Sequence, residues 1–241
     1  MDVTLQTLQQ WIDGSANIVF FGGAGVSTES GIPDFRSVDG LYHQKYDYPP
    51  EVMLSHTFLM SRSEEFFKFY REKMIAEWAK PNAAHQKLAE LESAGKLKAV
   101  ITQNIDGLHQ MAGSREVLEL HGSVHRNHCV KCRRDYPLAF VSKSHGIPVC
   151  EACGGMVRPD VVLYEEGLDT EVMNRAVAHI RDADILIIGG TSLVVYPAAG
   201  LINYYRGNKL VLINKAATSM DARANLVINS PIGEILSQIS L

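Results

Sequence analysis

The stretch Ile18-Val19-Phe20-Phe21-Gly22-Gly23-Ala24-Gly25 decides the fold of this 241-residue chain. Its first four residues are apolar and predict a buried β-strand, which leads directly into a glycine turn. A strand, a glycine turn and the start of a helix place backbone N–H groups where they can bind a phosphate. We therefore expect an α/β fold with a phosphate site at the end of this strand.

Further short apolar runs predict more strands. They are Ala99–Thr102, Val117–Leu120, Val161–Leu163, Ile185–Ile188, Leu210–Ile213 and Leu226–Ile228. Helical stretches separate several of them. Residues 3–13 form the first predicted helix, and the last predicted helix has Ser230 as its N-cap and Pro231 as its first residue. This alternation predicts a mostly parallel sheet with helices on both faces.

Two regions break the alternation. Residues 37–81 are rich in aromatics, and residues 122–158 carry all four cysteines but little core-forming sequence. We interpret both as insertions that together form a smaller lobe, while residues 1–36, 82–121 and 159–241 form the large domain. A cleft between two lobes is a common place for a ligand.

The four cysteines predict a metal site. Cys129-x2-Cys132 and Cys150-x2-Cys153 are separated by 17 residues, which is the spacing of a four-cysteine zinc ribbon. The alternatives are two redox-active CxxC pairs or unrelated free thiols. Because four sulfurs complete a tetrahedron, we expect one structural zinc without a catalytic role. It would hold together a small lobe that lacks a core of its own.

Composition and charge disfavour several classes of partner. Hydrophobic residues make up 46% of the chain and charged residues 21%, and the formal net charge is −4 without a dense Lys/Arg block. This is typical of a globular protein and disfavours nucleic acid as the primary partner. The N-terminus lacks the features of a signal peptide, and the one long uncharged stretch, residues 185–202, is interrupted by glycines and Pro197. We expect a cytoplasmic protein with no membrane partner.

The glycine turn does not continue as it does in a dehydrogenase. Thr28 stands where the usual Gly-x-Gly-x-x-Gly fingerprint has its third glycine, and Gly31 and Pro33 end any helix at once. No second strand ending in an acidic residue follows. The chain therefore disfavours hydride transfer and predicts a long loop at a functional site.

Polar segments follow three of the predicted strands. They are Gln103-Asn104-Ile105-Asp106, His121-Gly122 and Gly190-Thr191-Ser192, each at the edge where parallel sheets bind ligands. Each has a plain alternative. Asn104 can cap the next helix, Ser192 can be a turn residue, and His121 can be structural.

Taken together, the motifs resemble those of the sirtuin family, in family order. They are Gly23 to Arg36 (GAGVSTESGIPDFR), Thr102 to His109 (TQNIDGLH), Leu120-His121-Gly122, the paired CxxC motifs, Gly190 to Ala198 (GTSLVVYPA) and Leu212-Ile213-Asn214. The resemblance covers residues from about 18 to 235 and is closest to a compact bacterial-type member. It implies a Rossmann-like parallel-sheet domain with a small inserted lobe, made of a zinc ribbon and a helical module.

The resemblance implies an enzyme that consumes NAD to remove acyl groups, acetyl first, from protein lysines. The products are nicotinamide, free lysine and O-acyl-ADP-ribose. His121 would act as the general base on a ribose hydroxyl, a role that suits imidazole because its reference pKa lies close to working pH. Asn104 would hold a water or a ribose hydroxyl, Asp106 would bind the nicotinamide amide, and Phe35 would shield the reactive ribose from stray water.

The resemblance also assigns binding residues by their position in the motifs. The expected NAD contacts are Ala24, Thr28, Phe35, Arg36, Gln103, Ile105, Asp106, His121, Thr191, Ser192, Asn214 and Ile232. The substrate peptide is expected to add a strand along Val161, Val162, Leu193, Val194 and Val195.

The chain departs from the family pattern at two places, and at a third it differs from the relatives that remove succinyl groups. Gly22 stands where the family often has Thr, and Tyr164-Glu165-Glu166 stands where it often has Phe-Gly-Glu, which puts a charge beside the expected peptide channel. Relatives that remove succinyl groups carry Phe-Tyr-x-x-Arg, whereas Phe69-Tyr70-Arg71-Glu72-Lys73 has Lys73 in place of the last Arg. Because lysine lacks the planar fork that grips a carboxylate, we expect a preference for neutral acyl groups.

Two other functions stay open on the sequence alone. One is an NAD-dependent ADP-ribosyl transferase or NAD hydrolase that uses the same pocket. The other is a zinc-ribbon binding module without catalysis, which the acidic net charge and the NAD-like glycine loop both disfavour.

Overall fold

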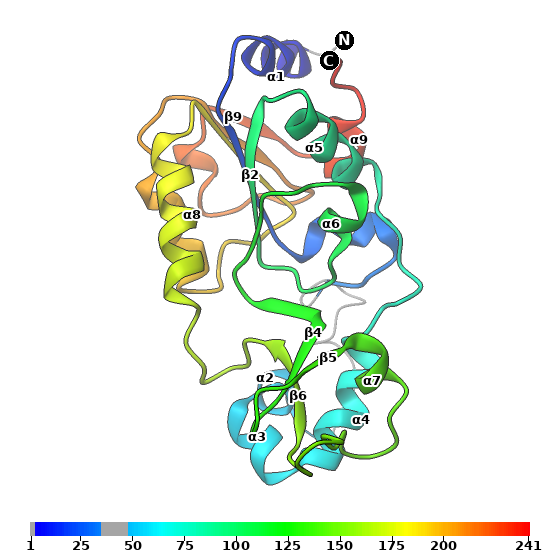
Figure 1. Cartoon of the computed structure of the whole chain (residues 1–241). Coiled ribbons are helices and arrows are strands. Elements are labelled where there is room, and N and C mark those ends of the chain that lie inside the picture. Colours follow the sequence, from blue (N-terminus) through cyan, green and yellow to red (C-terminus); the bar gives the residue numbers. More distant parts are fainter. Residues whose placement is uncertain (1–2, 35–47) are drawn as a thin grey trace.

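The computed structural model describes residues 3–34 and 48–241 and divides the chain into a large and a small lobe (Figure 1). The large lobe is built on a six-stranded parallel sheet with the strand order β3-β2-β1-β7-β8-β9. Its strands are β1 (Ile18–Gly22), β2 (Leu97–Thr102), β3 (Val117–Glu119), β7 (Ile185–Gly189), β8 (Leu210–Ile213) and β9 (Leu226–Ile228). This is the Rossmann-like order, so the predicted fold class is confirmed.

Helices on both faces of the sheet explain why its central strands are apolar throughout. Along β1, Ile18 and Phe20 pack into one core, while Val19 and Phe21 pack into the other, as the two-residue period of a strand requires. The first core is covered by α1 (Val3–Asp13), α5 (Ala83–Ser93) and α9 (Ile232–Leu236). The second is covered by α8 (Thr170–Asp182) and the 3₁₀ helix η4 (Ala198–Tyr204).

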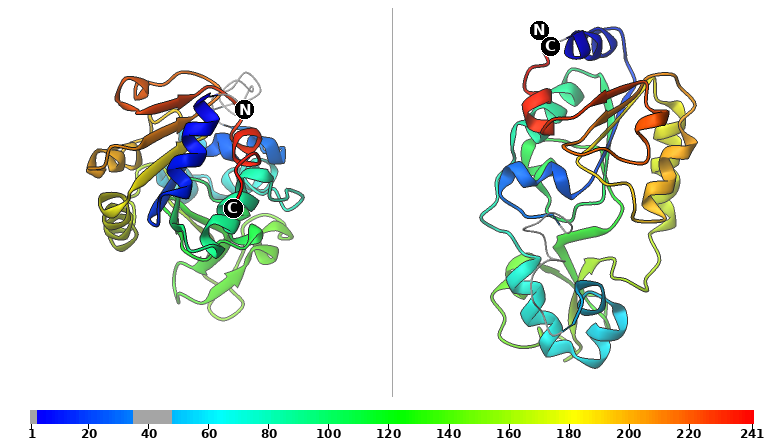
Figure 2. Two further views of the ribbon diagram at one scale, coloured as in Figure 1. Left: turned by 90° about the horizontal axis from the view of Figure 1, so that it is seen from above. Right: turned by 180° about the vertical axis from the view of Figure 1, so that it is seen from behind.

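Helix α1 confirms the prediction for residues 3–13, and it lies beside the C-terminal segment (Figure 2). The side chain of Gln9 exchanges two hydrogen bonds with the backbone of Ser240, at 3.0 and 2.9 Å. Leu5, Leu8 and Ile12 are buried, so helical periodicity alone was sufficient to place this helix.

The small lobe combines helices with a three-stranded antiparallel sheet of order β5-β4-β6. Its elements are α2 (Pro50–Met53), α3 (His56–Ser61), α4 (Ser63–Lys73), β4 (Gly122–Cys129), β5 (Asp135–Pro137), α7 (Leu138–Ser142) and β6 (Val157–Val161). Aromatic side chains of α4, among them Phe66 and Tyr70, pack against Val124 and Val157 of this sheet. The expectation that the lobe lacks a core of its own was therefore wrong, because the two insertions complete one core between them.

Two local predictions were also wrong. The apolar run Val161–Leu163 does not form a strand of the parallel sheet. The strand in this region is β6 (Val157–Val161), and it pairs with β4 of the small sheet. The last helix begins at Ile232 with Pro231, not Ser230, as its N-cap. The extended backbone of Pro231 (ψ 135°) delays the helix by one residue, and the Glu29 carboxylate, 2.8 Å from the Gly233 N–H, accepts its hydrogen bond.

Core packing explains why residue 22 is a glycine. A β-carbon at this position would lie 2.7 Å from a ring carbon of Phe20 and 3.2 Å from Val26. The Phe20 ring therefore fills the space that a threonine side chain would need. The hydroxyl that the family often has beside the phosphate loop is excluded here by the core.

None of the helices within residues 3–34 and 48–241 has the length and apolar character that crossing a membrane requires. The domain limits stated above stay a prediction of the sequence.

The structure predicts that the protein loses stability in mild acid. His85 and His109 are buried with their ring centroids 4.6 Å apart. Burial lowers the pKa of His85 to about 4, against an opposing effect of Asp106, and burial followed by the neighbouring His85 lowers that of His109 to about 3. Between those values and 6.5 the unfolded chain binds protons that the folded chain does not, so stability falls as pH falls.

We expect the free energy of unfolding to drop by up to about 1 kcal/mol per pH unit for each histidine in this window. Denaturant titrations at pH 7, 6 and 5 measure this slope. His109→Gln should make the slope shallower, whereas replacement of the exposed His145 by Gln should leave it unchanged. Equal slopes in all three proteins would contradict the assignment.

Candidate active site and metal centre

A cleft of about 1350 Å³ lies where the two lobes meet. The large lobe contributes the three polar segments predicted from the sequence. They follow the strands β2, β3 and β7. The small lobe contributes mostly apolar side chains, namely Leu54, Met74, Val124, Leu138, Val161 and Leu163. A polar floor and an apolar roof are suited to a ligand with a charged part and an uncharged part.

The glycine turn forms the floor through close backbone contact. The Gly25 N–H donates a 2.8 Å hydrogen bond to the carbonyl of Gly190, the residue after β7. A β-carbon at Gly25 would lie 2.8 Å from that carbonyl oxygen, so a side chain does not fit. The ends of β1 and β7 therefore meet at the switch point of the sheet, where doubly wound folds bind dinucleotides.

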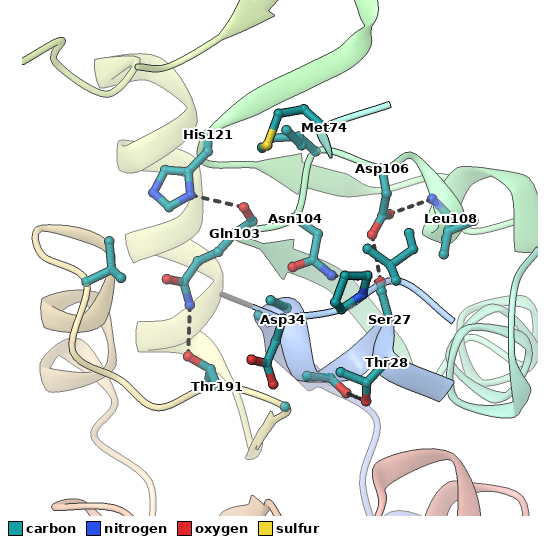
Figure 3. A pocket seen from close by; sticks show the side chains of 18 of the residues that line it. Ser27, Thr28, Asp34, Met74, Gln103, Asn104, Asp106, Leu108, His121 and Thr191 are labelled. Atoms are coloured by element: carbon teal, nitrogen blue, oxygen red, sulfur yellow. Dashed lines mark hydrogen bonds between the residues drawn. The ribbon is translucent and has the colours of Figure 1, made fainter. Parts of the chain in front are cut away.

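A first hydrogen-bond network links three strand ends across this floor, and Figure 3 shows its bond between Gln103 and Thr191. Gln103 donates from its Nε2 to the Thr191 hydroxyl at 3.1 Å, and the Thr191 N–H donates to Asn214 Oδ1 at 3.0 Å. The Nδ2 of Asn214 is buried and has no hydrogen-bond partner among the described residues. A buried donor without a partner is costly, so this wall fits a polar ligand such as the ribose of a dinucleotide.

A second network fixes the loop after β2. Asn104 Nδ2 donates to the Ser27 hydroxyl at 3.0 Å, which in turn donates to Asp106 Oδ2 at 2.6 Å (Figure 3). Asp106 Oδ1 accepts the N–H of Leu108, the first residue of α6 (Leu108–Ala112), at 2.9 Å. The N-cap of α6 is Gly107, and Asp106 rather than Asn104 binds the first N–H of the helix, so the plain alternative for Asn104 does not hold.

His121 is oriented as a base. Its Nδ1 lies 3.0 Å from the carbonyl oxygen of Gln103, which can only accept, so Nδ1 carries the proton. Nε2 is then left with a lone pair in a residue that lines the cleft. Burial lowers the pKa of His121, against the smaller effect of the Gln103 hydrogen bond, so the ring is neutral at pH 7.

The segment that carries His121 crosses between the lobes and is tied to the loop below it. The Val124 N–H donates to the carbonyl of Ile105 at 3.0 Å, and His125 Nε2 bonds the carbonyl of Asp106 at 2.9 Å. Together with the bond from His121, three carbonyls of the Gln103–Asp106 loop are held by one short stretch of β4 and its approach.

The remaining predicted residues divide into three groups. Ala24, Thr28, Ile105, Ser192, Ile232, Val161, Val162 and Val195 line the cleft with the residues already described. Leu193 is buried in the large-lobe core and Val194 is exposed, and neither lines the cleft. Phe35 and Arg36 lie outside the described residues.

Among the residues that sequence reasoning missed, three are important to the geometry of the site. Ser27 joins Asn104 to Asp106, His125 holds the Asp106 carbonyl, and Met74 forms part of the roof. Ser27 stands inside the glycine-turn motif, so its position was a usable signal. His125 and Met74 reach the cleft only through tertiary packing, and the sequence carried no signal for them.

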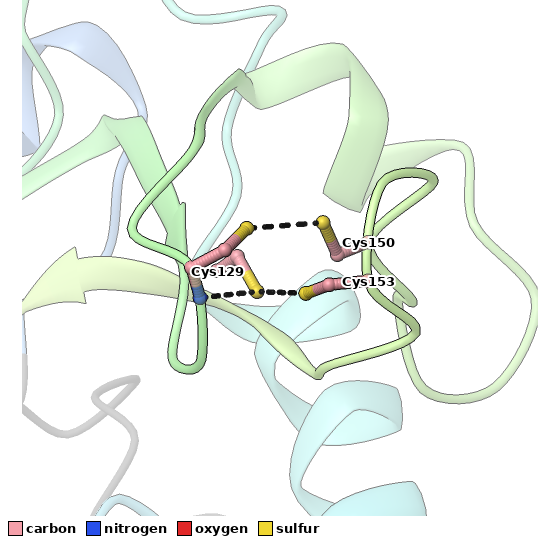
Figure 4. Close-up of side chains that lie close together, drawn as sticks. Cys129, Cys150 and Cys153 are labelled. Atoms are coloured by element: carbon pink, nitrogen blue, oxygen red, sulfur yellow. Dashed lines mark hydrogen bonds between the residues drawn. The ribbon is translucent and has the colours of Figure 1, made fainter.

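The four cysteines come together in the small lobe, and Figure 4 shows how their sulfurs gather. All four Sγ atoms lie within 4.8 Å of one another, with 3.5 Å between Cys129 and Cys153 and 3.6 Å between Cys132 and Cys150. None of the four is in a disulfide. Zinc with Zn–S bonds of about 2.3 Å in a tetrahedron needs sulfurs about 3.8 Å apart, so the cluster fits a structural zinc.

Neighbouring donors support thiolate ligands. The Tyr136 hydroxyl donates to Cys150 Sγ at 3.1 Å, and this bond lowers the pKa of the Cys150 thiol to about 6. The backbone N–H groups of Lys131 and Cys132 point at Cys129 Sγ, at 3.4 and 3.5 Å. Such outer contacts orient metal ligands and favour their charged form.

Fold and site together define a dinucleotide-binding enzyme class with an inserted four-cysteine lobe, and comparison with known proteins gives the family. The family model "Sir2 family" matches residues 23–197. An NAD-dependent protein deacetylase of Clostridium acetobutylicum is 61% identical over 238 residues, which cover 98% of this chain and 97% of that protein. One of Clostridium perfringens is 60% identical over 242 residues, covering 99% of both chains.

Solved structures agree. A Sir2 homologue in complex with NAD superposes with a TM-score of 0.88 at 39% identity, covering 99% of this chain and 92% of that chain. Sir2 bound to a p53 peptide and NAD⁺ gives a TM-score of 0.84 at 39% identity, covering 98% and 96%. The chain belongs to the Sir2 family, and the resemblance stated from its motifs is confirmed.

We expect one tightly bound zinc per chain. Cys150→Ser should release the metal and unfold the zinc-binding part of the small lobe, because the binding energy of a structural zinc is folding energy. Val149→Ser, which alters the exposed neighbour, should keep the metal. Metal analysis by mass spectrometry checks both variants, and less than about half an equivalent of zinc in freshly purified, active protein would refute the expectation.

Proposed function

We propose that this chain is an NAD-dependent protein deacetylase that transfers the acetyl group of a protein lysine to ADP-ribose. The observation that carries the mechanism is the neutral imidazole of His121, whose Nδ1–H is held by the Gln103 carbonyl so that Nε2 faces the cleft as a base. NAD is consumed as a co-substrate, and its ribose accepts the acyl group as nicotinamide leaves. The products are nicotinamide, free lysine and O-acetyl-ADP-ribose.

The chain's own residues divide the work of binding. Asn214 and Thr191 offer polar groups for the sugar and phosphates, together with Ala24, Thr28, Gln103, Ser192 and, at the adenine end, Ile232. Asn104 turns its Oδ1 into the pocket, away from Ser27, and is suited to hold a water or a ribose hydroxyl (Figure 3). Asp106 is proposed for the nicotinamide amide, Ile105 for its ring, Arg36 for a further cofactor contact, and Phe35 for shielding the ribose.

The substrate is proposed to be an acetylated lysine in an extended peptide. Strand β6 is the edge strand of the small sheet, and the residues that follow it line the cleft. An edge strand offers backbone groups to an added strand, with Val161 and Val162 on one side and Leu193, Val194 and Val195 on the other. We further propose the cytoplasm as its location, because zinc-binding thiolates persist in a reducing compartment, and neither nucleic acid nor a membrane as a primary partner.

A product analysis tests the function directly. The protein is incubated with NAD and an acetyl-lysine peptide, and the products are identified by mass spectrometry. Deacetylated peptide and O-acetyl-ADP-ribose in equal amounts support the proposal. Free ADP-ribose without peptide deacetylation indicates an NAD hydrolase, ADP-ribose attached to the peptide indicates a transferase, and no consumption of NAD indicates a binding module.

His121→Ala should reduce deacetylation by roughly 10²–10⁴-fold, the usual effect of removing a general base, while NAD binding changes far less. In the unaltered enzyme, the lowered pKa of His121 means that kcat/KM falls only as pH drops below 6.5. A variant that retains near-full turnover would show that His121 is structural.

The acyl preference follows from the placement of α4. Tyr70 is buried in the small-lobe core and does not line the cleft, whereas Lys73 does. Arg71 donates to Ser144 Oγ and the Gly146 carbonyl, at 3.1 and 2.9 Å, which holds it to the loop after α7. Among the described residues, α4 thus offers a succinyl carboxylate in the cleft no planar fork.

We expect kcat/KM for an acetyl-lysine peptide to exceed that for the matched succinyl-lysine peptide. Steady-state kinetics on the two peptides decide the point. Equal or faster removal of succinyl would show that Lys73 suffices for a carboxylate.

A further inference from the structure

Glu165 adopts a backbone conformation that residues with side chains rarely adopt. Its φ is +76°, in the left-handed region where glycine is free of steric cost. The related pattern Phe-Gly-Glu has glycine at this position. Side chains persist in this region when their surroundings hold them, and they gather at functional sites. The contacts of Glu165 must therefore stabilise this backbone conformation.

The contacts of Glu165 hold the turn against the start of α3. Its Oε2 accepts the Thr57 N–H at 2.9 Å and the Thr57 hydroxyl at 2.7 Å. At the preceding residue, the Tyr164 N–H donates to the Leu54 carbonyl and the Tyr164 carbonyl accepts from the His56 N–H, both at 3.0 Å. The carboxylate is thus fixed in place rather than free in solvent.

The carboxylate of Glu165 has no Lys or Arg partner among the described residues, in contrast to that of its neighbour. Glu166 forms two contacts with the Arg158 guanidinium, at 2.5 and 2.9 Å, and one with His56 at 2.8 Å. Both donors to Glu165 are uncharged, and no Lys or Arg of the described residues pairs with it. The hydrogen bonds from Thr57 lower the pKa of the Glu165 carboxyl, so a full negative charge is present at neutral pH.

Glu165 lies on the wall of the cleft with its backbone open to a partner. The N–H groups of Val162, Leu163 and Tyr164, and the carbonyls of Leu163 and Tyr164, bond to other parts of the chain. Within the described residues, neither the N–H nor the C=O of Glu165 has such a bond. An extended peptide that pairs with these two groups brings its own side chains beside the carboxylate.

We propose that Glu165 selects substrates that carry a lysine or arginine within two or three residues of the acetylated lysine. This rests on the proposed deacetylase function and adds a substrate class to it. The attraction acts at an exposed site, so it favours basic peptides by about three- to fivefold in kcat/KM and weakens as salt screens it.

The test compares matched acetyl-lysine peptides in which the flanking residues are Lys, Arg, Ala or Glu. We expect the order Lys and Arg above Ala above Glu, with the differences shrinking between 50 mM and about 500 mM salt. Glu165→Gln keeps an oxygen for Thr57 but removes the charge, and it should bring the Lys-to-Ala ratio close to one. Glu165→Gly, which removes both charge and left-handed strain, should do the same.

Glu64→Gln is the matched control, because Glu64 is exposed on α4 of the same lobe and does not line the cleft. It should retain the wild-type ratio. If the unaltered enzyme deacetylates the Ala peptide but shows no higher kcat/KM on the Lys and Arg peptides, the proposal is overturned and the deacetylase function stands. A preference that survives both Glu165 variants, or is lost in Glu64→Gln, would also overturn it. No deacetylation of any peptide would refute the proposed function itself.

Discussion

The rest of the site depends on one backbone contact, the hydrogen bond from Gly25 to the carbonyl of Gly190. It brings the ends of β1 and β7 together at the point where the strand order reverses, with no side chain between them. Because both residues are glycines, the turn after β1 lies low enough to leave a cleft above it. The network of Gln103, Thr191 and Asn214 then spreads across the same floor.

A second constraint links the two lobes. The chain leaves the large lobe at His121 and enters the small sheet as β4, and along this crossing it bonds three carbonyls of the Gln103–Asp106 loop. His121 and the loop that carries Asn104 and Asp106 are thereby held at a fixed distance from each other. The four-cysteine cluster and the aromatic core of α4 hold the rest of the same strand, because Cys129 ends β4 and Val124 packs into that core. The stability of the small lobe thus bears directly on the geometry of the cleft.

The deacetylase chemistry explains why this Rossmann-like sheet departs from a dehydrogenase. A dehydrogenase uses its second strand to place an acidic residue on the ribose. Here β1 is followed by two 3₁₀ turns, at Ala24–Val26 and Thr28–Ser30, and the next strand of the sheet in the described chain begins only at Leu97. The space that the missing unit leaves is lined instead by Asn104, Asp106 and His121, which are polar groups suited to attack on a ribose rather than to hydride transfer.

The sequence by itself determined the family, the parallel sheet, the first helix and the four metal ligands. These follow from short-range patterns: apolar runs, helical periodicity and CxxC spacing report on neighbours along the chain. Only the tertiary structure decided that Val157–Val161 joins the small sheet and that Tyr70 is buried while Lys73 faces the cleft. It alone also showed that His125 and Met74 belong to the site. The physical reason is that strand partners and the exposed face of a helix are set by packing between segments far apart in sequence, which a local pattern does not encode.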